Sequence, residues 1–181
     1  MLSTTFIRAS FAALLIPFLP ITQAAPLSCN APRSEVTDIA TAVNKWRADT
    51  GTVSQFLSTA TGLSGSRLVS AAKIALAAEN DELTHKAVID KYLGQDTTIK
   101  GADHTLVGDQ TFQSVVDALQ DFVDNGAKKT PEQVDRLVKN TNKVRCGAVL
   151  PAIDTYFRVS ANFLNTGLAA VAARPNNCPA Q

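Results

Sequence analysis

The sequence predicts an all-α protein, built as an up-down antiparallel bundle of about five helices. Apolar or near-apolar residues recur at steps of three and four through residues 36–60, which places them on one face of an α-helix. Residues 67–93 are rich in alanine, the best helix former. Most connections between the predicted helices are short, which favours antiparallel neighbours. The first stripe consists of Val36, Ile39, Val43, Trp46, Thr50, Val53, Leu57 and Ala60.

The first 24 residues have the pattern of a secretory signal peptide. Arg8 is their only charge, an apolar run follows over residues 9–21, and small residues end the segment at Ala24. The run contains two prolines and is too short to span a bilayer. We therefore expect a signal peptide over 1–24, a single secreted helical-bundle domain over 25–181, and no transmembrane segment in the mature chain.

The charge balance argues against nucleic acid as a partner. Of the 17 basic residues, Arg8 lies in the predicted signal peptide, and the remaining basic residues equal the 16 acidic ones. Nucleic acid and anionic membranes both attract a basic surface, which a formally neutral chain lacks.

Each predicted helix has a start and a stop. The first begins near the cap Ser34 and ends at Thr61-Gly62, and the second covers about 67–93, with Glu79, Asp81, Glu82 and Lys86 marking its solvated side. Residues 94–108 form a long polar connection that we expect to be mobile, with part of it folded back over the bundle.

Three further helices follow this connection. One runs from Asp109 to Asn125-Gly126, and the next begins at Thr130-Pro131-Glu132-Gln133, a threonine cap with proline at the first helical position. Gly147 ends that helix, Pro151 opens the fifth, and Arg174-Pro175 stops it.

No catalytic constellation is predicted. Glu82-x-x-His85, preceded by Glu79, resembles half of a di-iron motif, but such sites need a second pair, and the only other histidine is His104 in the connection. We therefore interpret these acids as solvated helix charges and expect no metal, no cofactor and no enzymatic activity. The segment Gly62–Ser66 lacks the final glycine of a nucleophile elbow and follows no strand.

The large aromatic residues have two interpretations. Packing in the core is the simpler one. The alternative is that bulky side chains opposite the alanine-rich helix line a cavity for an apolar ligand, since pockets in bundles form between helices. The candidate ligand-binding residues are Val43, Trp46, Leu76, Leu83, Phe112, Leu119, Phe157 and Leu164.

The three cysteines predict one disulfide bond and one remaining thiol. In an up-down bundle, Cys29 precedes the first helix and Cys146 ends the fourth, so both lie at one end. A fifth helix that continues to Arg174 carries Cys178 to the other end, and the few residues after Arg174 reach only about 14 Å. This topology predicts a Cys29–Cys146 bond and leaves Cys178 free or available for a dimer.

Two segments, Val53–Leu57 and Arg145–Pro151, together with the signal peptide, resemble the small secreted helical proteins of filamentous fungi. The chain is also more distantly similar to the fungal hydrophobic-surface-binding protein A and cell-wall galactomannoprotein group. That resemblance implies an all-helical, non-enzymatic protein that holds a lipid or coats a hydrophobic surface. The chain departs from the group in its three cysteines and in lacking a Ser/Thr-rich wall-attachment tail.

Two functional hypotheses follow. The first is a secreted binding protein for a lipid-like ligand or hydrophobic surface. The alternative is a secreted interaction or effector protein that uses its surface loops and has no ligand.

Overall fold

The computed structural model describes residues 32–167 and 169–179, and this part is all-α, as predicted. The predicted signal peptide and Cys29 lie outside the described residues. The helical elements are α1 (Arg33–Thr59), η1 (Ala60–Gly62), α2 (Gly65–Leu93), α3 (Thr97–Asp103), η2 (His104–Gly108), α4 (Thr111–Asn125), η3 (Gly126–Lys128), α5 (Pro131–Val144), η4 (Arg145–Val149) and α6 (Leu150–Leu164).

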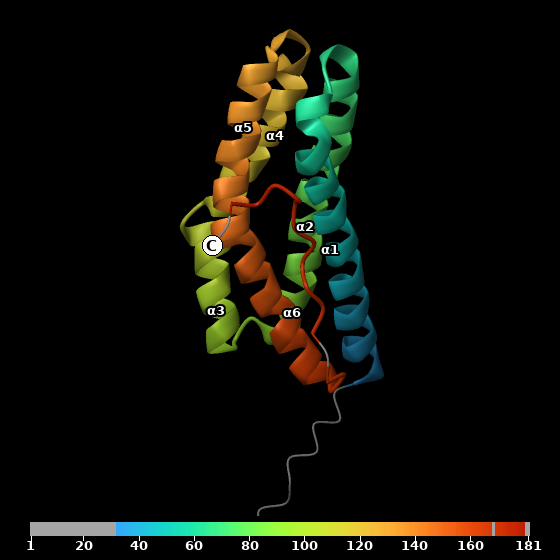
Figure 1. Cartoon of the computed structure of the whole chain (residues 1–181). Coiled ribbons are helices and arrows are strands. Elements are labelled where there is room, and N and C mark those ends of the chain that lie inside the picture. The colour runs from blue at the N-terminus through green and yellow to red at the C-terminus, as the bar shows by residue number, and fades with distance from the viewer. Residues whose placement is uncertain (1–31, 168, 180–181) are drawn as a thin grey trace, which may run out of the picture. The chain divides into compact units, whose positions relative to one another are not determined.

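The helices pack side by side in alternating directions (Figure 1). The chain runs one way through α1, returns through α2, runs the first way again through α3 and α4, and returns through α5 and α6. Helix α1 packs on α2, α2 on α4, α4 on α5, and α3 on α6. None of the described helices is long and apolar enough to cross a lipid bilayer.

Aromatic side chains fill the core between these helices. The ring of Trp46 on α1 lies 5.2 Å from that of Tyr156 and 5.6 Å from that of Phe157, both on α6. Towards the other end of the bundle, the Phe56 ring meets the Phe122 ring edge-to-face at 5.2 Å. Such pairs stabilise a core beyond the apolar area that they bury.

Helices α5 and α6 form one bent helix instead of the two separate helices that we predicted. The bend is the π-helical turn η4, which contains Gly147, and Pro151 lies in the first turn of α6. Proline lacks an amide proton and a π-turn shifts the hydrogen-bond register, so both bend a helix without ending it.

The connection over 94–108, predicted to be mobile, is largely helical. Asp96 caps α3, because its carboxylate accepts hydrogen bonds from the amides of Thr98 at 2.7 Å and Ile99 at 3.2 Å. Ile99 and Leu106 are buried against the bundle, which confirms the prediction that part of this connection folds back over it. Apolar anchors and a cap thus order a segment whose composition is mostly polar.

The predicted disulfide pairing is wrong, because Cys146 bonds to Cys178. Cys178 is therefore neither a free thiol nor available for a dimer. The error lies in the length of the last helix: α6 ends at Leu164, where Asn165 takes a left-handed conformation with φ 52°. The fourteen residues from Asn165 to Cys178 can extend over roughly 45–50 Å, whereas the 15 residues of α6 rise only about 22 Å.

The segment after α6 returns along α1, seen as the red trace in Figure 1. Ser54 Oγ donates to the Ala173 carbonyl at 2.6 Å, and Ser58 Oγ accepts from the Asn176 amide at 3.0 Å. Asn177 Nδ2 donates to the Leu57 carbonyl at 3.1 Å. These bonds and the disulfide hold the C-terminal segment on the bundle.

We expect the Cys146–Cys178 bond to appear as a linked peptide in non-reducing peptide mapping. Its loop has a sequence separation of 32 residues, for which the chain-entropy estimate gives about 3–4 kcal/mol of stabilisation. Replacing both cysteines with serine should therefore lower the free energy of unfolding by up to that amount in urea titrations. A mapped bond from Cys29 to either partner would contradict the assignment.

Candidate functional site

A charged network lies inside the bundle, around the guanidinium group of Arg145. Arg145 Nη1 donates to Glu79 Oε2 at 2.6 Å, and Nη2 donates to Glu82 Oε1 at 3.2 Å and to the Thr50 carbonyl at 3.5 Å. Trp46 Nε1 donates to the other oxygen of Glu82 at 2.8 Å. All five residues have an exposed fraction of zero. The network therefore joins α1, α2 and the bend of the α5–α6 helix without contact with solvent.

The charges of this network do not cancel when both carboxyl groups are ionised. Burial raises the pKa of Glu79, against the opposing charge of Arg145. The pKa of Glu82 is raised well above its usual value, first by burial and then by the charge of Glu79. Glu79 Oε1 has no hydrogen-bond partner among the described residues. We infer that the two carboxyl groups retain one proton, which leaves a neutral network.

The prediction that Glu79, Glu82 and Lys86 are solvated is wrong, since all three are buried. The buried stripe of α2 has four- and three-residue steps that continue through these charges: Leu68, Ala72, Ala75, Glu79, Glu82, Lys86 and Ile89. Arg145 similarly continues a stripe of Val134, Val138 and Thr141. The three- and four-residue spacing of these positions indicated burial, whereas their charged residue types indicated exposure to solvent.

Lys86 forms a second polar cluster between α2, α3 and α6. Its ammonium group pairs with Asp90 at 2.6 Å and with Asp103, and the Tyr156 hydroxyl donates to Asp90 at 2.8 Å. Burial lowers the pKa of Lys86, but the hydrogen bonds from Lys86 to Asp103 and Asp90 outweigh it and the pKa rises. Lys86 therefore stays charged and ties the short helix α3 to the bundle.

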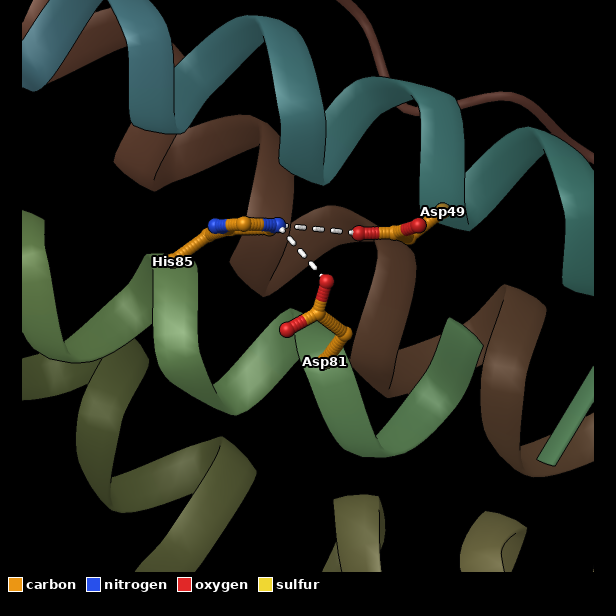
Figure 2. A group of neighbouring side chains, drawn as sticks. All are labelled: Asp49, Asp81 and His85. Atoms are coloured by element: carbon orange, nitrogen blue, oxygen red, sulfur yellow. Dashed lines mark ion pairs between the residues drawn. The ribbon is translucent and has the colours of Figure 1, made fainter. Parts of the chain in front are cut away.

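A third cluster, shown in Figure 2, joins α1 and α2 through an imidazole and two carboxylates. His85 Nε2 lies 3.1 Å from Asp49 Oδ2 and 3.4 Å from Asp81 Oδ2. Burial raises the pKa of Asp49, His85 opposes that rise, and Asp81 adds to it. The di-iron-like pair of the sequence does not converge, because Glu82 belongs to the Arg145 network and His85 to this cluster.

Only three of the eight predicted ligand-binding residues line one cavity. Val43, Phe157 and Leu164 border a cavity of about 340 Å³. Trp46, Phe112 and Leu119 are buried in the core, and Leu76 is half-buried. Leu83 is exposed to 39 % and faces away from the core.

Comparison of the chain with protein families, with curated proteins and with solved structures finds no match. The resemblance to fungal secreted helical proteins therefore stays a prediction.

We predict that the proton retained by the two glutamates makes the stability fall as pH rises. A carboxyl group whose pKa is raised in the folded state stabilises the folded protein fully at pH values below its pKa in the unfolded chain, 4.5 for glutamate. That stabilisation is lost as the pH rises through the pKa of the folded state. Glu79→Gln, which imitates the protonated form, should therefore become more stable relative to wild type from pH 4 to pH 9, by up to about 1.4 kcal/mol per pH unit. Urea titrations across that range measure it.

The control for this prediction is Glu132→Gln, because Glu132 is exposed and the hydrogen bond to Thr130 lowers its pKa. The difference in the free energy of unfolding between Glu132→Gln and wild type should stay constant over the upper part of this pH range. Parallel curves for Glu79→Gln would show that both glutamates are ionised in the folded protein.

We also predict that Arg145→Met lowers the free energy of unfolding by about 3–5 kcal/mol, because it leaves two buried carboxyl groups without their cation. Combining it with Glu79→Gln and Glu82→Gln should recover much of that loss. A loss in the triple variant at least as large as in Arg145→Met would argue that packing of the arginine, and not its charge, stabilises the bundle.

Proposed function

We propose that this protein is a secreted, non-enzymatic, up-down helical bundle that binds a small amphipathic acid, such as a fatty acid, beside α1 and α6. The signal peptide predicted over 1–24 supports secretion. The observation that supports ligand binding is the cavity of about 340 Å³ bordered by Val43, Phe157 and Leu164, which were candidates from the sequence alone.

The cavity has apolar walls from three segments. Helix α1 contributes Ala40 and Val43, α6 contributes Phe157, Ala161 and Leu164, and the C-terminal segment contributes Ala169 and Ala170. Its volume is at the lower end of the range typical of small-molecule pockets. Small and aliphatic side chains of this kind suit a short acyl chain.

Polar groups lie at the same cavity and suit an acidic headgroup. Asn44, Arg47 and Thr166 border it. Arg47 is exposed, and its guanidinium has no ion-pair partner within the described part of the chain. A carboxylate at the cavity mouth would therefore complete a salt bridge while its chain enters between the helices.

The wall formed by the C-terminal segment is anchored just beyond the cavity. The Ala172 amide donates to Asp154 Oδ1 at 2.8 Å, and Arg174 Nη2 pairs with Asp154 Oδ2 at 2.5 Å. The disulfide follows at Cys178. A wall fixed in this way keeps the cavity formed before binding, which reduces the entropy lost when a ligand is ordered.

The test is a titration of folded, delipidated protein with a fluorescent fatty acid. We expect saturable binding and a change in the emission of Trp46, the only tryptophan of the chain, because its ring packs on Phe157. Ala40→Phe should fill the cavity and weaken binding at least tenfold. Arg47→Gln should weaken binding of the acid about fivefold, as expected for an exposed ion pair of up to about 1 kcal/mol, and leave the methyl ester unaffected.

Ala71→Phe is the matched control. Ala71 and the 65 %-exposed Ile74 border a different groove of about 490 Å³ between α1 and α2. This variant should bind as wild type. Loss of binding in Ala71→Phe but not in Ala40→Phe would place the ligand in the other groove, and absence of binding in wild type would favour the secreted interaction protein without a ligand.

A further inference from the structure

We propose that Asp49, Asp81 and His85 bind a divalent transition-metal ion, with Zn²⁺ the best-suited ion. Asp81 and His85 are four residues apart, which puts them on one face of α2, and Asp49 faces them from α1 (Figure 2). Their ligand atoms all lie within 4.8 Å of one another. The site is separate from both the Arg145 network and the proposed acid-binding cavity.

Two of the three distances within the cluster are those of ligands around one ion, and the third, between the carboxylate oxygens of Asp49 and Asp81, is at most 4.8 Å. Zinc lies about 2.0–2.2 Å from imidazole nitrogen and carboxylate oxygen, so two ligands at octahedral to tetrahedral angles are about 3.0–3.4 Å apart. His85 Nε2 is 3.1 Å from Asp49 Oδ2 and 3.4 Å from Asp81 Oδ2. An ion therefore fits with small movements of the side chains.

The buried side chain of His85 gives the second observation. Its side chain is exposed to only 8 %, and it points at the two carboxylates. His85 Nε2 and Asp49 Oδ2 are both buried and neither makes a hydrogen bond of regular geometry within the described structure. Buried polar atoms without such partners are rare and costly, and a single metal ion would satisfy both. A protonated His85 held by the two carboxylates is the competing arrangement, and the experiment separates the two.

Charge and ligand type select the ion. Two carboxylates and a neutral imidazole together carry two negative charges, which balance a divalent cation. Lys45 is a nearby basic residue that interacts electrostatically with Asp49. Ca²⁺ and Mg²⁺ prefer oxygen ligands, so a site with an imidazole ligand binds them poorly. The same ligand suits ions such as Zn²⁺. The Asp81 side chain is exposed to 56 %, which gives the ion an entry path and leaves a coordination position for water.

The test is calorimetric titration of metal-stripped, full-length protein with Zn²⁺. We expect one ion per chain, at least tenfold weaker binding in His85→Gln and in Asp81→Asn, and no saturable binding of Ca²⁺. Zn²⁺ at a hundredfold excess over its Kd should raise the unfolding midpoint by about 5–10 °C in wild type. At the same Zn²⁺ concentration, that rise should fall to about half or less in Asp81→Asn.

His104→Gln is the matched control. His104 Nδ1 lies 3.4 Å from Asp109 Oδ1, but the pair is exposed and offers a single carboxylate. This variant should bind Zn²⁺ as wild type. Asp81 is largely exposed, so Asp81→Asn should fold and decides the question even where His85→Gln does not. Absence of saturable binding in wild type, or binding that is unchanged in Asp81→Asn, would overturn the proposal and leave His85 as an ion-paired side chain.

Discussion

The fully buried charge of Arg145 is the constraint on which the rest of the bundle depends. A guanidinium cannot lose its proton in a protein, so the surrounding helices must supply compensating acceptors. They do so from two directions: Glu79 and Glu82 on α2 bind its nitrogens, and the Thr50 carbonyl of α1 accepts a weaker bond. The bend at η4 begins at Arg145. The disulfide at Cys146 follows directly, so the bend, the network and the attachment of the C-terminal segment are neighbours in one short stretch.

The sequence predicted the helices well where apolar residues define a face. The predicted stripe is buried from Ile39 to Ala60, whereas its first member, Val36, is 37 % exposed, and Thr130 makes the capping box with Gln133. Prediction failed where a polar residue continues an apolar stripe, because residue type indicates solvent whereas position indicates the core. In α2 the small side chains of Ala72 and Ala75 admit close packing, and the glutamates that follow extend the same face into the interior.

The cluster of Asp49, Asp81 and His85 shows what a sequence can and cannot reveal about side chains on different helices. The four-residue spacing of Asp81 and His85 is visible in the sequence. Asp49 is not, because its approach depends on how α1 is rotated and shifted against α2, to which Trp46 Nε1 is joined by its hydrogen bond to Glu82. The disulfide was missed for a related reason: Ala169, Ala170 and Val171 favour a helix locally, yet the chain leaves the helix at Asn165 and packs its last residues along α1.

The middle of α1 connects the cavity, the aromatic core and the Asp49–Asp81–His85 cluster. Within two turns, Val43 and Arg47 border the cavity, Trp46 enters the core, and Asp49 faces His85. The Trp46 ring packs on Phe157, a wall of the cavity, while its indole nitrogen is bound to Glu82 of the Arg145 network. A wall residue that packs on a tryptophan held in this way has little freedom to move into the cavity. The charged core is therefore connected through Trp46 to Phe157, the aromatic wall of the cavity, and helps to fix its position.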